Sequence, residues 1–139
     1  MPEARVRPVT FIEMVFPDQT NHYGTLFGGY ALRLMDKAAF VAASRYARRT
    51  VVTASSERID FKAPVHHGNL VELTAEVVAT GRTSMTVEVE LVEEDLLRGE
   101  RKLCALGRFV MVSLGEDGRP TEVPALSEKS KTSGKGAVR

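Results

Sequence analysis

The stretch GGYALRLMDKAAFVAASRYAR, residues 28–48, decides how the rest of the chain can be arranged. Apolar residues recur in it every three or four positions, which is the spacing of a helix. Further apolar residues between them widen this stripe over most of the circumference, and clear polarity appears only near the end, at Arg45 and Arg48. A helix this apolar must be largely enclosed, so the pattern predicts one long central helix.

Outside this stretch the apolar pattern changes to the two-residue period of strands. Residues 71–79 and 85–91 alternate apolar and polar side chains, and Gly81-Arg82 between them favours a tight hairpin turn. Three further strands are predicted over residues 9–16, 51–61 (the least regular) and 103–111. The predicted order is therefore a strand, a long helix and four strands joined by short connections.

This order excludes a doubly wound parallel sheet, because only one connection is helical. We expect an α+β domain in which a five-stranded, mainly antiparallel sheet wraps around the helix. A single helix cannot cover both faces of such a sheet or protect its edges, so self-association is expected. Residues 1–126 are predicted to form this single domain, and residues 127–139 a basic, disordered tail.

Composition narrows the class of protein. The 139 residues contain 19 Lys+Arg and 18 Asp+Glu, and the tail holds four basic residues and one acidic residue. The domain is therefore slightly acidic, which argues against a nucleic-acid partner. The chain lacks both an 18-residue apolar run and an apolar signal core, so we expect no membrane span or secretion. The single cysteine, Cys104, is expected to be buried, and it fits a cytoplasmic protein without a disulfide or Cys-rich zinc site.

One carboxylate interrupts the apolar helix, that of Asp36. Enclosing a carboxylate costs free energy unless it is paired, hydrogen-bonded or used. From this residue alone, a solvated position beside Arg33 or Lys37 is an equal alternative. The preceding stretch NHYGTLFGG, residues 21–29, favours a functional role. Two glycines at the start of a helix let a ligand approach closely and leave free N–H groups that can stabilise an oxyanion.

The residues NHYGTLFGGYALRLMDKAA, 21–39, resemble the signature of hotdog-fold acyl-CoA thioesterases, in the group of bacterial short-chain and broad-range hydrolases related to the mammalian brain-type enzyme. Over roughly residues 9–114 the likeness continues through Val52-Thr53-Ala54-Ser55, Ile59-Asp60-Phe61-Lys62-Ala63-Pro64-Val65, Gly68 and Gly81-Arg82-Thr83-Ser84-Met85. The resemblance implies the hotdog fold and hydrolysis of acyl-CoA to a free acid and CoA. It also implies a cytoplasmic enzyme of fatty acid metabolism that needs no cofactor or metal, with a homodimer as its minimal unit and a trimer of dimers, a hexamer, as its assembly.

The resemblance also implies roles for individual residues. Asp36 matches the catalytic carboxylate, Asn21 the motif asparagine near the thioester, and Gly28 or Gly29 the backbone N–H that polarises the thioester carbonyl. Six residues fall in segments that line the CoA groove of relatives: Arg58, Phe61, Lys62, Arg82, Thr83 and Ser84. The adjacent histidines His66-His67 match no motif of the family and are assigned no role.

The helical spacing adds a hypothesis about assembly. Gly28 and Asp36 are eight residues apart, about 12 Å along a helix at 1.5 Å per residue. A carbonyl held at Gly28 is therefore too far away for a water activated by Asp36 of the same chain. Two antiparallel copies of the helix would bring Asp36 of one chain toward Gly28 of the other, so we expect an active site shared by two chains.

Two other functions stay open at this point. A hotdog dehydratase would act on acyl carrier protein with a catalytic histidine, whereas this helix offers Asp36. A non-catalytic acyl-CoA sensor could retain the groove, but such sensors usually carry an additional DNA-binding or regulatory domain, for which 139 residues leave no room. The sequence does not define the acyl length, because pocket depth depends on residues such as Tyr30, Leu34 and Phe40 in the assembly.

Overall fold

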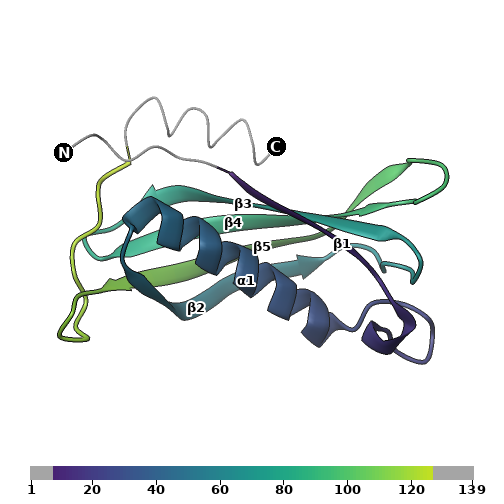
Figure 1. Cartoon of the computed structure of the whole chain (residues 1–139), viewed down its shortest axis with the longest axis horizontal. Coiled ribbons are helices and arrows are strands. Elements are labelled where there is room, and N and C mark those ends of the chain that lie inside the picture. The colour runs from purple at the N-terminus through teal and green to yellow at the C-terminus, as the bar shows by residue number, and fades with distance from the viewer. Residues whose placement is uncertain (1–7, 127–139) are drawn as a thin grey trace.

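Residues 8–126, which the computed structural model describes, form one long helix and five strands in the predicted order (Figure 1). The helix α1 spans Gly28–Ala47 and follows a short 3-10 turn, η1, at Pro17–Gln19. The strands are β1 (Val9–Met14), β2 (Thr50–Phe61), β3 (Leu70–Thr80), β4 (Ser84–Glu94) and β5 (Arg101–Leu114). The predicted tail, residues 127–139, lies outside the described residues, so the division at residue 126 stays a prediction.

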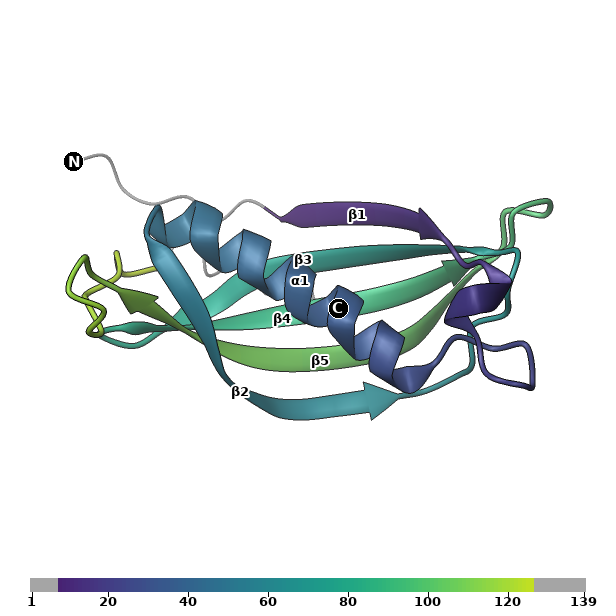
Figure 2. The ribbon, with the colours of Figure 1, turned by 60° about the horizontal axis from the view of Figure 1, so that its bottom comes forward.

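The strands form one sheet in the order β1-β3-β4-β5-β2, and every neighbouring pair is antiparallel. The helix lies across one face of this sheet and packs against all five strands, as Figures 1 and 2 show from two sides. This arrangement confirms the predicted α+β fold. β1 ends two residues earlier than predicted, because the backbone N–H of Val15 already pairs with the Asn69 carbonyl in a connecting loop.

The core fills the space between α1 and the facing side of the sheet. Met35 is the largest helix side chain that is fully buried, and the sheet supplies fully buried side chains at Leu73, Met85, Leu91 and Met111. As the sequence predicted, every second residue enters the core from Val71 to Val77 of β3 and from Met85 to Leu91 of β4. A register shift after Val77 ends the alternation, so Ala79, which the pattern placed on the core side, is exposed. Cys104 is also buried, at 1% exposure, as expected.

The β3–β4 hairpin turns tightly at the predicted glycine. The backbone N–H of Gly81 donates to the Ser84 carbonyl at 2.9 Å. A Cβ at Gly81 would lie 2.7 Å from the Ser84 hydroxyl oxygen, so any other residue would force the Ser84 side chain to rotate away. Glycine lets the turn close without this change.

Enclosure of the helix is incomplete in a single chain. Leu32 and Phe40 on α1 are 37% and 46% exposed, and Val52 on the neighbouring edge strand β2 is 44% exposed. Every residue from Val52 to Arg58 is exposed, and two register shifts against β5 bend β2 around the helix (Figure 2). The prediction of a largely enclosed helix therefore holds for only one of its faces within one chain.

Candidate active site

The start of α1 offers backbone donors to open space. The first residues of the helix, Gly28 and Gly29, follow Phe27, whose side chain forms no capping hydrogen bond. The first N–H groups of a helix have no partner inside it, and here the first amide that bonds back to Phe27 is that of Ala31. A Cβ built on either glycine would meet nothing within 4 Å. The chain itself therefore leaves room for a ligand over these amides, as an oxyanion site requires.

Asn21 shapes the loop that leads into the helix. Its Oδ1 atom accepts three hydrogen bonds, from the backbone N–H of Tyr23 (2.9 Å), the backbone N–H of Thr25 (3.2 Å) and the Thr25 hydroxyl (3.1 Å). The side-chain oxygen is thus committed to the turn. The Nδ2 group forms no hydrogen bond to residues 8–126, so it is the part of Asn21 that can donate to a bound molecule.

Asp36 lies half-buried in the middle of α1 and faces the edge strand β2. Its Oδ1 atom accepts a hydrogen bond from the hydroxyl of Thr53 at 2.7 Å. Within the described part of the chain it forms no ion pair with Arg33 or Lys37, the partners of the solvated alternative. Sequence analysis did not single out Thr53 itself. The only signal for it was its position in the segment Val52-Thr53-Ala54-Ser55 that carries the family resemblance.

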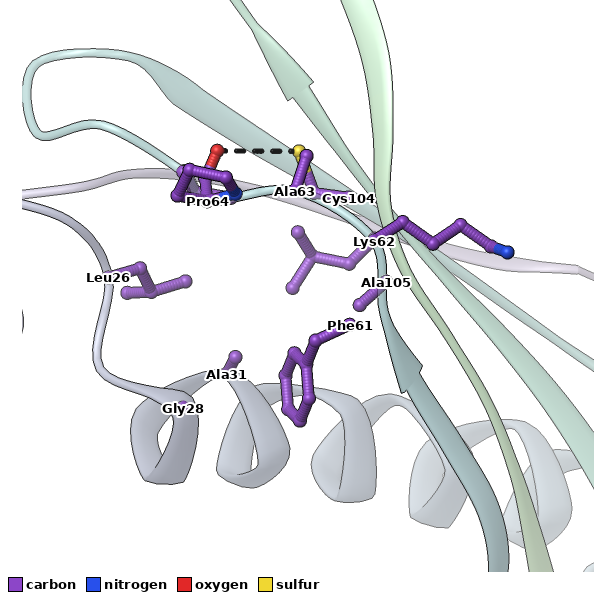
Figure 3. A pocket seen from close by; sticks show the side chains of 11 residues that line it. Leu26, Gly28, Ala31, Phe61, Lys62, Ala63, Pro64, Cys104 and Ala105 are labelled. Carbon is purple, nitrogen blue, oxygen red and sulfur yellow. Dashed lines mark hydrogen bonds between the residues drawn. The ribbon is translucent and has the colours of Figure 1, made fainter.

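A pocket of about 330 Å³ opens beneath the first turn of α1. Figure 3 shows it between the helix start, the end of β2 with the loop that follows it, and the inner face of the sheet. Apart from Lys62, its lining residues carry no charged side chain, and they are Leu26, Gly28, Ala31, Phe61, Lys62, Ala63, Pro64, Val65, Leu91, Cys104 and Ala105. A pocket of this size and character is suited to an apolar group.

The rim and the wall of the pocket differ in chemistry. The phenyl ring of Phe61, 54% exposed, stands beside the first turns of the helix, and the Lys62 side chain extends away from the cavity (Figure 3). In the wall, the Cys104 thiol lies 3.8 Å from the Pro64 carbonyl oxygen, to which it can donate. Burial raises the pKa of this thiol, with the Glu93 carboxylate adding to the shift. Cys104 therefore remains a neutral thiol at neutral pH, which is unsuitable for a nucleophile.

The six residues predicted to line a CoA groove fall into two groups. Phe61 and Lys62 border the pocket, and Arg58 lies three residues earlier on β2, where it pairs with Asp60 at 3.1 Å. Arg82, Thr83 and Ser84 lie in the β3–β4 hairpin at the opposite end of the sheet. Along β4 this end is about 23 Å from the pocket at about 3.3 Å per residue. One chain therefore does not bring the two groups together.

Residues 8–126 contain no group of three or more His, Cys, Asp or Glu side chains that could hold a metal ion. Among the same residues, no helix has both the length and the apolar character needed to cross a membrane.

The family of this chain is identified by comparison with known proteins. The model of the thioesterase superfamily matches residues 23–100, which include the helix, β2, β3 and β4. The chain belongs to the thioesterase superfamily. Membership confirms the hotdog fold and the enzyme class, a thioester hydrolase, that the sequence predicted.

Relatives of this thioesterase chain are named for action on acyl-CoA. The uncharacterized acyl-CoA thioester hydrolase YkhA of Bacillus subtilis is 40% identical over 112 residues, which are 81% of this chain but 65% of that protein. A hexameric acyl-CoA thioesterase has a TM-score of 0.85 at 38% identity, covering 94% of this chain and 85% of that one. An acyl-CoA hydrolase of Staphylococcus aureus, in complex with butyryl-CoA and CoA, has a TM-score of 0.84 at 32% identity, covering 94% and 81%.

The Staphylococcus aureus hydrolase has also been solved as variants in which one asparagine, one aspartate or one threonine is replaced by alanine. These three residues follow one another at intervals of fifteen and seventeen positions. Asn21, Asp36 and Thr53 follow one another at the same intervals in this chain.

Proposed function

We propose that this protein hydrolyses acyl-CoA to a free carboxylic acid and CoA. The observation that carries the proposal is the pair of open amides at Gly28 and Gly29 beside an apolar pocket. A thioester carbonyl bound at these amides becomes anionic as it is attacked, and donors already in place stabilise that charge. The acyl group enters the pocket, where each buried methylene contributes about 0.8 kcal/mol.

The pocket is too small for the whole substrate. At about 330 Å³ it lies near the lower limit for small-molecule sites, so it encloses the acyl group and not the nucleotide of CoA. The phosphates of CoA then lie outside, where Lys62 offers positive charge at the pocket and Arg58 farther along β2. No cofactor or metal takes part in this proposal, since CoA belongs to the substrate and the product.

Asp36 is the proposed catalytic carboxylate. It acts either as a general base that removes a proton from the attacking water, or as a nucleophile whose mixed anhydride is then hydrolysed. The Thr53 hydroxyl at 2.7 Å fixes the orientation of the carboxylate for either route. Asn21 directs its free Nδ2 group at the thioester oxygen or the water, because its Oδ1 atom is already occupied.

The active site is proposed to need two chains. Gly28 and Asp36 lie on one uninterrupted helix, so the separation of about 12 Å along its axis that the sequence predicted applies to the folded chain. An antiparallel copy of the chain would bring Asp36 of one chain to Gly28 of the other, and its β3–β4 hairpin with Arg82 to the pocket rim. The exposed apolar side chains on α1 and the free edge of β2 supply a surface for such a homodimer. The hexameric neighbour supports a hexamer as the full assembly, which we propose to be a trimer of such dimers. A chain with a single cysteine and no disulfide also fits the proposed place in the cytoplasm.

The direct test is release of free CoA from a panel of acyl-CoAs of different length, followed with a thiol reagent. We expect turnover by the native protein, and a loss of at least about a hundredfold in Asp36→Asn, the range for a lost acid or base. Asp95→Asn, which changes a half-buried aspartate in the β4–β5 hairpin, is the matched control and should leave turnover unchanged. Native turnover by a folded Asp36→Asn protein would contradict the catalytic role of Asp36. Binding of acyl-CoA without any turnover in the native protein would instead indicate an acyl-CoA sensor.

A further inference from the structure

Two loops are joined at the end of the sheet nearest the pocket. Residues 20–27 carry Asn21 toward the helix, and residues 62–69 connect β2 to β3. Thr25 and His66 form an isolated antiparallel bridge between these loops. The Leu26 N–H donates to the Val65 carbonyl at 2.7 Å, and the His67 N–H to the Gly24 carbonyl at 3.1 Å. The Asn21 loop therefore rests on the backbone of the second loop.

The second loop is in turn held by one carboxylate, that of Glu93 near the end of β4. Its Oε2 atom accepts from the backbone N–H of His66 (2.8 Å) and from the side-chain amide of Asn69 (3.1 Å), and lies 3.2 Å from Nδ1 of the His66 ring. The Glu93 residue is only 8% exposed. Burial by itself would raise the pKa of this carboxyl, but these hydrogen bonds from His66 and Asn69 together hold the pKa below its ordinary value.

We propose that Glu93 is a positioning residue for Asn21. The connection runs from the Glu93 carboxylate to His66, from His66 through the backbone bridge to Thr25, and from Thr25 to the Oδ1 atom of Asn21. Glu93 touches no reacting atom, so it acts only through this chain of contacts. His66, for which the sequence indicated no role, is the link between the carboxylate and the loop.

The chemistry of Glu93 favours positioning over simple filling of space. An apolar side chain could occupy this buried place, and it would avoid the cost of removing a charge from water. Only an acceptor, however, can fix the His66 amide and the Asn69 side chain at one point, since hydrogen bonds are directional. The carboxylate therefore defines where residues 66–69 lie, and with them the turn that carries Asn21.

The inference rests on the proposed thioesterase function, and a double-mutant cycle tests it. Glu93→Ala should lower kcat about tenfold or more while KM changes less than about threefold, because small misplacements of catalytic groups reduce the rate strongly. In the Asn21→Ala background the same change should cost less than about twofold, since Glu93 then has nothing to position. Equal losses in both backgrounds would overturn the proposal. So would a folded Glu93→Ala protein with native kcat.

Further variants separate positioning from a general loss of structure. Glu93→Gln keeps an acceptor of the same shape and should retain kcat within about threefold. If the alanine variant does not fold, the double-mutant cycle is run with Glu93→Gln. The smaller decrease in kcat that this substitution causes must then be absent in the Asn21→Ala background. Glu94→Ala is the matched control, because Glu94 is the next residue of β4 and pairs with Arg101 at the surface. It should leave kcat unchanged.

Amide hydrogen exchange makes the test independent of turnover. Glu93→Ala should speed exchange at the amides of Gly24, Thr25 and Leu26, which the native contacts protect, and leave the amides of β4 and β5 near their native rates. If the native protein hydrolyses no acyl-CoA, the proposed function fails while exchange still reports on the link from Glu93 to the loop. Unchanged exchange at these three amides would overturn the positioning role.

Discussion

The strands β4 and β2 have similar lengths but very different surroundings. β4 lies in the middle of the sheet between β3 and β5, and alternate residues from Met85 to Leu91 enter the core. β2 is an edge strand that pairs only with β5, is bent by two register shifts, and exposes every residue from Val52 to Arg58. The middle of the sheet therefore maintains the fold, whereas the free edge beside Asp36 is the part that we propose for assembly and chemistry.

The same substitution in the two strands gives the largest expected contrast. Val87→Ala on β4, where the side chain is fully buried, should lower the free energy of unfolding by about 2 kcal/mol or more, because it removes buried methyl groups and leaves a cavity. Val52→Ala on β2 should instead give a smaller loss that grows as the protein is diluted, since it weakens association. Thermal unfolding at several protein concentrations measures both. Equal losses, independent of concentration, would break the comparison.

Complementation tests whether the edge of β2 forms a shared site. Asn21→Ala and Asp36→Asn proteins, unfolded together and refolded, should form mixed dimers with one intact site among two. Random pairing makes about half the dimers mixed, so about a quarter of native activity should return. Mass spectrometry verifies that mixed dimers are present. If they are present without more activity than the parents, both residues serve from the same chain and the two-chain site must be abandoned.

Replacing cations at the two ends of the sheet should have a smaller effect than the changes above. Replacing Lys62 at the pocket and Arg82 in the hairpin with alanine should raise KM for acyl-CoA about tenfold with little change in kcat, because both would contact CoA phosphates. The increase in KM should shrink as salt is added, since salt screens exposed charges. Arg98→Ala, at the tip of the β4–β5 hairpin, is the control and should leave KM unchanged. An unaltered KM in the double variant at low salt would place the CoA groove elsewhere.

The smallest expected effect concerns pH and the end of β4. The pKa of Glu93 is lower in the folded chain than its ordinary value, so the ionised carboxylate adds stability at neutral pH. This contribution should disappear as the pH falls from about 5 through the lowered pKa, because the folded state must then take up a proton. The difference in Tm between the native protein and Glu93→Gln should therefore become smaller as the pH is lowered from about 5.5 to about 3.5. A constant difference would show that Glu93 is not held in its charged form.

The fold was predictable from the sequence because helices and strands leave patterns among residues that are close together along the chain. The helical period after Gly28 and the alternation through residues 85–91 each reflect one side of one element facing the core. Even the start of the helix was predictable from its paired glycines. The ends of strands were less so, since β1 stops at Met14 where a loop contact replaces the ladder.

The candidate site depended on contacts that no local pattern contains. Thr53 reaches Asp36 across seventeen positions because the chain reverses after Ala47 and β2 runs back beside the helix. Glu93 follows the core-facing residues of β4 at the same two-residue spacing, so a charged residue there interrupts the apolar side of the strand. Its meeting with His66, however, requires the loop of residues 62–69 to fold back over the sheet. Family resemblance supplied Asn21 and Asp36, but it could not reveal which residues hold them.

The wall of the pocket contains a natural reporter. Cys104 is the only cysteine among the 139 residues, so any thiol reagent labels the chain at one place. Because this thiol is buried and its pKa is raised, alkylation has to wait until the wall opens and the thiol ionises. The rate of labelling therefore measures how often the pocket wall opens transiently, and a bound acyl group should slow the labelling. Mass spectra recorded at successive times after addition of the reagent would thus follow occupancy of the pocket in the native sequence, without a chromophore or an engineered tag.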